Sequence, residues 1–375
     1  MRPPVETDAG DRAFRIDTVR LEGFRNYALA EVSLGEGLNV LWGENAQGKT
    51  NFLEAVNLVA TSRLLRGFRD AEAIGAGCER YDVRVVLSET GTEIGMRMER
   101  NARKRAFLNG VPLPRAADVL GRLPCTCVSS ADLAVVCGEP SSRRVFLDLE
   151  ICQFFPAYLG HLSNYKRALE QRNALLKLSR DAPQPDAAFE VWEAPMARHG
   201  AAMRQFRLDW TSRLQKHAQG VHAAMGSGES LRLVYEAKDA ASDEESVARA
   251  LRERRREDIG RGTTSVGPHR DDLRIEVGGR EARLFGSQGQ QRTAAISLKL
   301  ASLSAGREQI GAMPLLLLDD VFSDLDAGRR ARMSAWILEH AAQAILTCTE
   351  PEAAGDGVLH AARQFRVQGG TIWRS

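Results

Sequence analysis

Hydrophobic residues near the N-terminus alternate with polar ones in short runs separated by turn residues. Three such runs cover residues 15–24, 27–34 and 38–42. A longer alternating stretch extends from Tyr81 to Leu108, and Asn109 and Gly110 after it can form a hairpin turn. Because period-two alternation is typical of half-buried strands, we expect three early strands followed by an antiparallel meander.

The hydrophobic period becomes helical between residues 140 and 226. One stripe of apolar residues at helical spacing comprises Phe189, Trp192, Met196, Met203, Phe206, Trp210 and Leu214. The stripe predicts either one long amphipathic helix or a pair of helices broken near Pro195, in both cases packed on a core. Farther along, the pattern predicts a strand at 230–237, a charged helix at 243–256 and a helix that opens near Ser287.

A glycine-rich loop follows the strand expected at 38–42, and a helical pattern follows the loop. The loop reads Gly43-Glu44-Asn45-Ala46-Gln47-Gly48-Lys49-Thr50. A strand, a glycine loop and a helix in this order form a phosphate-binding P-loop, because the loop N–H groups and the helix N-terminus both attract anions. Lys49 is expected to reach the β- and γ-phosphates, and the Thr50 hydroxyl to ligate Mg²⁺. The sequence therefore predicts a binding site for a nucleoside triphosphate.

Two carboxylates end another predicted strand. The run Leu315–Leu318 is wholly apolar, as expected at the centre of a parallel sheet, and Asp319 and Asp320 follow it. Such sheets bind ligands at the carboxyl ends of their strands. We expect Asp319 to hold Mg²⁺ through its water shell, and Asp320 to orient or deprotonate an attacking water.

A second anion-binding turn opens the helix that begins near Ser287. The turn, Ser287-Gln288-Gly289-Gln290, consists of small and amide residues, which leave the N–H groups of a helix start open to an anion. One nucleotide does not need two such turns. Two nucleotides shared between two copies of the chain would use both turns of each copy.

The chain resembles the ABC-type ATPases. The segments 43–50, 287–290, 315–320 and 323–326 are similar to their Walker A, signature, Walker B and D-loop motifs. Within this superfamily the chain resembles the DNA-handling branch, which includes SMC and Rad50 heads, and in that branch the RecF family of bacterial recombination and replication-repair proteins. That similarity also covers residues 21–27, 143–148, 165–176 and 267–273, and transporter ATPases do not share the last three.

The resemblance implies an α/β fold, namely an ABC-type head with mixed sheets and an inserted helical arm. We expect a flexible tail at 1–12, a discontinuous head at 13–138 and 228–375, and the arm at 139–227. Each ATP would be held by Gly43–Thr50 and Asp319 of one protomer and capped by Ser287, Gly289 and Gln290 of the other. The D-loop residue Asp326 is expected to belong to the same nucleotide site.

The resemblance also implies an ATP-dependent homodimer that grips DNA and cooperates with RecO and RecR to load RecA at single-strand gaps, with a part in SOS induction. It implies a weak ATPase stimulated by DNA, and two departures from transporter ATPases suggest slow hydrolysis. Asp320 is one methylene shorter than the usual glutamate, and Thr347-Cys348-Thr349 stand where transporters place a switch histidine. The alternatives are a transporter ATPase subunit and a P-loop kinase of a small metabolite.

Length and composition set the remaining limits. A chain of 375 residues suggests two domains, and the net charge of +2 gives no global argument for nucleic acid. Local basic residues are therefore the DNA candidates, with a solvated surface as the alternative: Arg63, Arg66, Arg103, Lys104 and Arg105. The sequence has neither a secretory signal nor an apolar run of about 20 residues, and its six scattered cysteines favour reduced thiols. These features predict a cytoplasmic, nucleoid-associated protein without a membrane partner.

Overall fold

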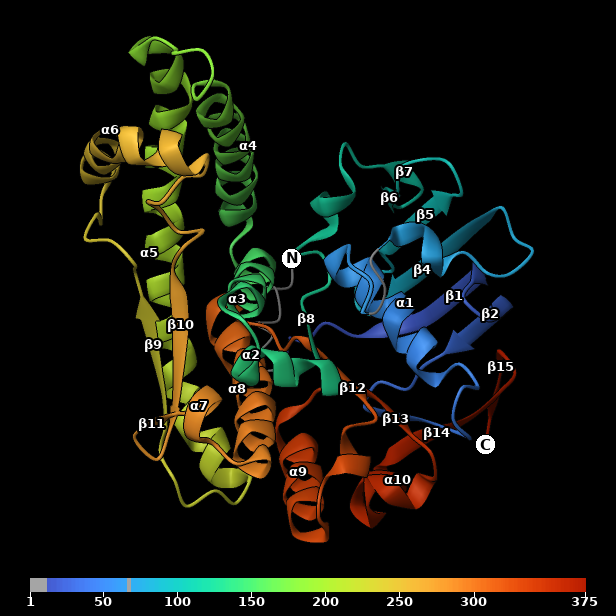
Figure 1. Ribbon diagram of the computed structural model, residues 1–375. Coiled ribbons are helices and arrows are strands. Elements are labelled where there is room, and N and C mark those ends of the chain that lie inside the picture. Colours follow the sequence, from blue (N-terminus) through green and yellow to red (C-terminus); the bar gives the residue numbers. More distant parts are fainter. Residues whose placement is uncertain (1–11, 66–68) are drawn as a thin grey trace, which may run out of the picture. The chain divides into compact units, whose positions relative to one another are not determined.

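The computed structural model describes residues 12–65 and 69–375, which form two compact units (Figure 1). Unit 1 contains the described residues up to Asp132 together with His217–Gly228 and Thr293–Ser375. Unit 2 contains Leu133–Lys216 and Glu229–Arg292. The division expected from the sequence, with a head at 13–138 and 228–375 and an arm at 139–227, stays a prediction, because this grouping places residues 229–292 with the arm helices.

The first sheet of unit 1 is mixed, with the strand order β15-β14-β3-β13-β12-β8. Its strands are β3 (Leu38–Trp42), β8 (Cys125–Ser129), β12 (Leu315–Asp319), β13 (Ala344–Cys348), β14 (Ala362–Gln368) and β15 (Thr371–Arg374). Neighbouring strands run parallel except β14 and β15, which form an antiparallel hairpin. β12 lies between two parallel neighbours and is buried along its whole length, which confirms the central strand predicted from its apolar run.

The second sheet of unit 1 is antiparallel, with the order β2-β1-β4-β5-β6-β7. Its strands are β1 (Ile16–Phe24), β2 (Tyr27–Ser33), β4 (Arg80–Leu87), β5 (Glu93–Glu99), β6 (Arg105–Leu108) and β7 (Val111–Pro112). The early strands and the meander predicted from alternation are confirmed. Local sequence patterns do not indicate, however, that β1 pairs with β4, whose partner residues lie sixty or more positions away, as in Val19 opposite Val85.

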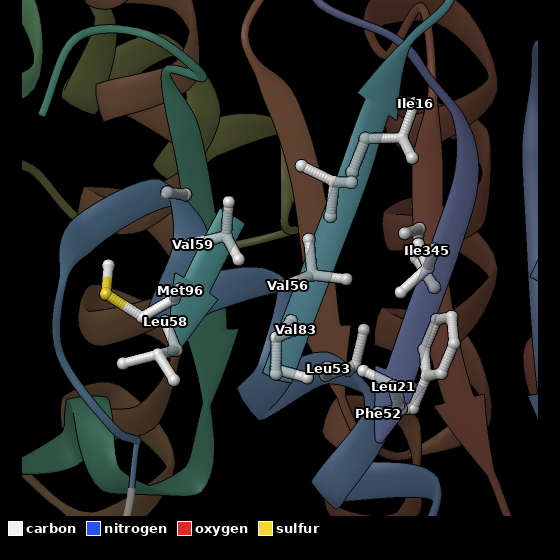
Figure 2. Packing of buried hydrophobic residues seen from close by; sticks show 14 of the residues in the cluster. Ile16, Leu21, Phe52, Leu53, Val56, Leu58, Val59, Val83, Met96 and Ile345 are labelled. Carbon is white, nitrogen blue, oxygen red and sulfur yellow. The ribbon is translucent and has the colours of Figure 1, made fainter. Parts of the chain in front are cut away.

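The helix after the P-loop, α1 (Lys49–Thr61), is buried nearly all round. Figure 2 shows Phe52, Leu53 and Val56 of this helix among side chains of β1, β4 and β13. Each such apolar side chain stabilises the fold by about 1.5–3 kcal/mol when fully buried. The start of α1, and with it the loop before it, is therefore fixed by the core of unit 1.

Further helices complete unit 1. They are η1 (Asp70–Ala73), η2 (Ala116–Val119), η3 (Ser130–Asp132), most of α8 (Gln288–Ile310), η4 (Val321–Asp324), α9 (Ala327–His340), η5 (Pro351–Ala354) and α10 (Asp356–Ala361). On α9 the rings of Trp336 and His340 stack with centroids 4.5 Å apart. The helix that was expected to open near Ser287 is confirmed as α8.

Unit 2 consists mainly of helices. It contains α2 (Leu133–Cys137), α3 (Pro140–Phe154), α4 (Pro156–Leu178), most of α5 (Asp186–Ala224), α6 (Glu244–Arg261), α7 (Ala282–Phe285), and a sheet of β9 (Leu231–Glu236), β10 (Asp272–Val277) and β11 (Arg280–Glu281). α5 is one continuous helix with Pro195 inside it, which decides between the two alternatives left by the sequence. Met196, Met203 and Trp210 of the predicted stripe are buried, as expected for a core face.

Buried ion pairs join α4, α5 and α6 within unit 2. Arg172 of α4 is fully buried, and its guanidinium binds Asp258 of α6 at 2.7 Å and Glu193 of α5 at 3.1 Å. Removing one member of such a pair typically costs about 3–5 kcal/mol, because the other charge is left buried without a partner. These pairs fix the register of the three helices.

The six cysteines are free thiols, as the sequence suggested. Among the residues that the structure describes, no helix is long and apolar enough to cross a membrane.

Candidate nucleotide-binding site

A cleft of about 420 Å³ opens beside the P-loop in unit 1. Its lining residues are Asn45, Ala46, Gly48, Lys49, Thr50, Asn51, Ser130, Asp319, Asp320, Ser323 and Thr347. These residues come from the loop after β3, from α1, and from the carboxyl ends of β8, β12 and β13. The structure thus brings the predicted Walker A and Walker B residues together at one sheet edge, where parallel sheets bind ligands.

Two glycines of the P-loop have backbone conformations and surroundings that exclude other residues. Gly43 has φ = 150°, and a Cβ added there would lie 2.3 Å from the carbonyl oxygen of Val367. Gly48 has φ = 120°, and its Cβ would lie 2.7 Å from Nδ2 of Asn26. The loop can follow this path only because both positions lack a side chain.

The Lys49 ammonium group points back into its own loop. Nζ donates hydrogen bonds to the carbonyl oxygens of Gly43 at 2.5 Å and Glu44 at 2.7 Å. Burial lowers the pKa of Lys49, and the nearby acidic groups of Asp320 and Asp319 oppose that shift. The ammonium group is therefore held within the loop, the position from which it can meet a phosphate.

Three oxygen-bearing side chains converge at the end of β12. The hydroxyl groups of Thr50 and Thr347 both donate to Oδ1 of Asp319, at 2.7 Å and 3.0 Å. Hydroxyl and carboxylate oxygens are the ligands that Mg²⁺ prefers, so this donor set fits the ion predicted for Thr50 and Asp319. Thr347 also accepts a hydrogen bond from the backbone N–H of Asp320 at 2.9 Å. Sequence reasoning noted Thr347 only as the position of a missing histidine.

The second carboxylate, Asp320, lines the same cleft. Its backbone is left-handed, with φ = 52°, an unusual conformation for a residue other than glycine. In this conformation its backbone N–H donates to the Thr347 hydroxyl, and Asp320 is the acidic group that acts most strongly on the pKa of Lys49. Strained backbone at a cleft is common in functional sites.

Two chain segments support the P-loop from outside the cleft, and the sequence did not predict their contacts. The backbone carbonyl of Gln47 accepts hydrogen bonds from Nδ2 of Asn26 at 2.9 Å and from the N–H of Gly370 at 3.1 Å. The Gln47 side chain accepts from the N–H of Gly369 at 2.7 Å. Tyr27 donates to the carbonyl of Gly48 at 3.0 Å. The β1–β2 turn and the β14–β15 turn therefore both hold the loop in place.

The predicted signature turn belongs to unit 2 and forms the start of α8. Ser287 and Gln290 cap this helix reciprocally: the Ser287 N–H donates to Oε1 of Gln290 at 2.7 Å, and the Gln290 N–H approaches Oγ of Ser287 at 3.3 Å. Ser287 is exposed. The side-chain amide of Gln290 also donates to the carboxylate of Glu229, which no sequence pattern had singled out.

The D-loop residue Asp326 has a helix-capping position. Its carboxylate accepts a hydrogen bond from the N–H of Arg329 at 2.9 Å at the start of α9. This bond lowers the pKa of Asp326, which is exposed. Ser323, three residues earlier, lines the cleft, and its hydroxyl donates to the carbonyl of Asp320.

The predicted DNA candidates differ in their surroundings. Arg63, Arg103 and Arg105 are exposed. Lys104 is engaged within unit 1, because Nζ donates to the carbonyl of Ser62 at 2.7 Å and to Asp70 at 2.9 Å. Arg66 lies outside the described residues. A DNA contact by any of the five stays a prediction.

The comparisons with known proteins decide the family. The model of the "RecF/RecN/SMC N terminal domain" family matches residues 15–368. A protein of Symbiobacterium thermophilum named "DNA replication and repair protein RecF" is 40% identical over 372 residues, which cover 95% of this chain and 97% of that protein. The chain belongs to the RecF family. A RecF protein of Lachnoclostridium phytofermentans is 36% identical over 95% of this chain and 99% of its own length.

Solved structures agree on the fold. The structure described as the recombination mediator protein RecF-ATP in the RecFOR pathway has a TM-score of 0.88 and 28% identity, covering 97% of this chain and 98% of its own. An Smc head domain from Pyrococcus furiosus, with a TM-score of 0.56 and 17% identity over 96% of both chains, shares the fold alone. The ABC-type head expected from the sequence is confirmed, and membership of the RecF family removes the transporter and metabolite-kinase alternatives.

Proposed function

We propose that the chain is an ATP-dependent DNA-binding protein of recombinational repair and replication restart. The cleft that joins Lys49, Thr50 and Asp319 in unit 1 is the observation that supports this proposal most strongly. The similarity of the chain to a solved RecF structure whose description names ATP supports ATP as the nucleotide. Related proteins named for DNA replication and repair support DNA as the partner.

Each residue of the cleft has a proposed role in ATP binding and hydrolysis. The N–H groups of Gly43–Thr50 surround the phosphates, and Lys49 turns from the carbonyls of Gly43 and Glu44 toward the β- and γ-phosphates. Thr50 and Asp319 hold Mg²⁺, which when bound neutralises charge on the phosphates. Asp320 orients the attacking water and accepts its proton.

ATP joins two copies of the chain in the proposed mechanism. Ser287, Gly289 and Gln290 of one protomer complete the site that the P-loop of its partner begins, and Asp326 contributes near the same interface. Ser287 is exposed at the start of the 23-residue helix α8, which supports this role because the N-terminus of a helix attracts anions. Hydrolysis at the short carboxylate Asp320 is slow and stimulated by DNA, and its rate sets how long the dimer stays on DNA.

The DNA bound is a single-strand gap or a junction, gripped mainly through phosphates, so that affinity falls steeply with salt and depends little on sequence. In the cell the protein acts in the cytoplasm, at the nucleoid, with RecO and RecR in loading RecA, and contributes to SOS induction. Two solved RecF structures whose descriptions name the RecFOR pathway support RecO and RecR as partners.

Sedimentation with ATP, with ADP and without nucleotide tests the proposal. Lys49→Ala is expected to abolish ATP-dependent dimerisation, because the γ-phosphate loses its cation. Asp320→Asn is expected to leave a long-lived ATP dimer on DNA. A Lys49→Ala protein that dimerises normally with ATP and fails only in turnover contradicts the proposed role of ATP.

A further inference from the structure

Three segments that resemble the RecF family, but that have no place in the nucleotide site, meet in unit 2. They are residues 143–148 on α3, 165–176 on α4 and 267–273 at the start of β10. Buried Arg207 of α5 joins the first and the third: its guanidinium binds Asp148 of α3 and the carbonyl of Pro268, both at 2.7 Å. The second is joined to the third by the Tyr165 hydroxyl of α4, which lies 2.6 Å from Nδ1 of His269. The three segments thus form one cluster.

The carboxylates of this cluster are occupied by buried cations. Asp271 is fully buried and receives two hydrogen bonds of 2.8 Å from Arg204. Asp272 binds the guanidinium of Arg143 at 2.7 Å and 2.9 Å. Because a buried arginine already neutralises each of these carboxylates, they attract the cations at the surface only weakly.

Three cations at the surface of the cluster have no strong acidic partner. Arg270 is exposed, and none of the described residues binds its guanidinium. Arg144 donates to a backbone carbonyl, that of Asp271, at 3.0 Å. The ammonium group of Lys166, whose side chain is 59% exposed, lies 3.8 Å from Asp148, beyond hydrogen-bonding distance.

The electrostatics of the cluster agree with an excess of positive charge. The pKa of Arg144 is lowered by burial and by the nearby charges of Arg207 and Arg270, and the carboxylates of Asp272 and Asp148 oppose this shift without cancelling it. Arg204 also binds Asp239 at 2.7 Å. These contacts therefore link four carboxylates, Asp148, Asp239, Asp271 and Asp272, to six cations, Arg143, Arg144, Lys166, Arg204, Arg207 and Arg270. A cation that is repelled by its neighbours gains more than an ordinary surface residue when an anion approaches.

The loop that carries Arg270 is held in a fixed conformation. His269 next to it bonds the Tyr165 hydroxyl through Nδ1 at 2.6 Å and the Thr264 carbonyl through Nε2 at 3.0 Å. Since a carbonyl only accepts, Nε2 carries a proton. Burial lowers the pKa of His269 to about 4, so the ring is neutral near pH 7 and Nδ1 accepts from Tyr165. Gly267 has φ = 119°, and a Cβ there would lie 2.4 Å from the Tyr165 oxygen. The guanidinium is therefore presented by a rigid support, which reduces the entropy lost on binding.

We propose that Arg144, Lys166 and Arg270 form a phosphate-binding face on unit 2 that contacts the backbone of nucleic acid. Guanidinium and ammonium groups bind phosphate oxygens without reading bases, so the face adds affinity but no sequence preference. The face belongs to unit 2, whereas the DNA candidates Arg63, Arg103 and Arg105 belong to unit 1. The inference rests on the proposed function of DNA binding.

The salt dependence of DNA binding tests this face. The full chain with ATP is titrated on a fluorescent duplex, and on a scrambled duplex of equal length, over a range of salt concentrations. For the triple variant Arg144→Gln, Lys166→Gln, Arg270→Gln, the slope of log Kobs against log salt is expected to become shallower by about one per residue, equally on both duplexes. The double variant Lys166→Gln, Arg270→Gln keeps the Arg144 contact to Asp271 and is expected to lose about two.

A matched control removes the same charge elsewhere in unit 2. Lys177, Arg252 and Arg256 are exposed on α4 and α6, and their triple substitution by Gln is expected to leave the slope nearly unchanged. The inference would be overturned if both triple variants changed the slope equally. It would also be overturned if neither the Arg144, Lys166, Arg270 variant nor the double variant changed the slope. If the wild-type chain with ATP does not bind DNA at all, the proposed function is wrong as well. If the wild type binds DNA and the variants leave the slope unaltered, only the inference is wrong.

Discussion

The side-chain amide of Gln290 lies 2.8 Å from both carboxylate oxygens of Glu229, and this contact joins the signature turn to the start of the strand β9. Glu229 also lies over the β10–β11 turn, where a Cβ on Gly278 would lie 3.2 Å from its Oε1. The carboxylate therefore positions Gln290 within unit 2, five residues beyond the end of α5.

Glu229→Ala is expected to weaken ATP-dependent dimerisation about tenfold while leaving ATP binding by the monomer unchanged. The amide of Gln290 would lose a charge-assisted hydrogen bond, which is typically worth about 1.5–3 kcal/mol, and would no longer be held for the partner's nucleotide. Sedimentation at several protein concentrations and titration with a fluorescent ATP measure the two effects. Glu229→Gln retains an acceptor oxygen and is expected to recover part of the dimer; equal loss in both variants, with monomer ATP binding also reduced, would indicate misfolding instead.

Thr347 is expected to affect turnover more than ATP binding. Its hydroxyl binds Asp319 at 3.0 Å and fixes the backbone N–H of Asp320 at 2.9 Å, so Thr347→Val releases both groups. The loss of about one hydrogen bond predicts a roughly tenfold lower kcat with little change in the dissociation constant of ATP. Thr347→Ser keeps the hydroxyl and should restore the rate. Steady-state ATPase assays with separate ATP titrations check this, and a variant that loses binding and rate together would contradict it.

The β14–β15 turn is expected to control ATP affinity through the P-loop. In Gly370→Ala the new Cβ would lie 2.1 Å from the carbonyl oxygen of Asn26, so the turn must move away from Gln47. We expect ATP affinity to fall by about tenfold, the effect of losing about one hydrogen bond of the loop support. Gly369→Ala is the matched control, because this residue also has positive φ but no atom lies within 4 Å of its added Cβ. Equal loss of ATP affinity in the two variants would show that backbone strain alone is responsible.

His269 is expected to make the fold less stable as the pH falls below neutrality. Burial lowers its pKa from 6.5 to about 4, so between these values the unfolded chain binds a proton that the folded chain does not. Stability therefore rises with pH in this window, and about 2 kcal/mol of unfolding free energy is lost between pH 7.5 and pH 5. Urea denaturation of the wild type and of His269→Gln measures the effect. The difference between their free energies of unfolding at pH 7.5 should become smaller by that amount at pH 5. An unchanged difference in unfolding free energy at the two pH values would contradict a lowered pKa of His269.

Local sequence patterns predicted much of unit 1. The apolar strands β3 and β12 and the glycine loop each have a signal within a few residues, and their meeting at one sheet edge follows from parallel topology. Long-range contacts gave no such signal. Glu229 binds a residue 61 positions away, and Gly370 binds Gln47 from the far end of the chain. Contacts of this kind depend on tertiary structure, which alternation and propensity do not encode.

Pro195 illustrates a competition between local and tertiary effects. A proline inside a helix removes one hydrogen bond and typically costs about 3 kcal/mol, so a break was a reasonable alternative. α5 continues through it, and Met196 and Ala197 directly after it are buried, as are Met203 and Trp210 farther along. Packing of this apolar face offsets the local cost.

The signature turn of one chain is proposed to complete the ATP site of another. Sedimentation velocity of wild type and Ser287→Arg with ATP tests it most directly, alongside a titration that measures ATP binding by each protein. Ser287 is exposed and belongs to unit 2, so the substitution leaves the P-loop cleft of unit 1 intact. We predict that the wild type shifts to a dimer with ATP, whereas Ser287→Arg binds ATP and stays a monomer. A Ser287→Arg protein that dimerises with ATP as readily as the wild type would contradict a role of the signature turn in the partner's ATP site.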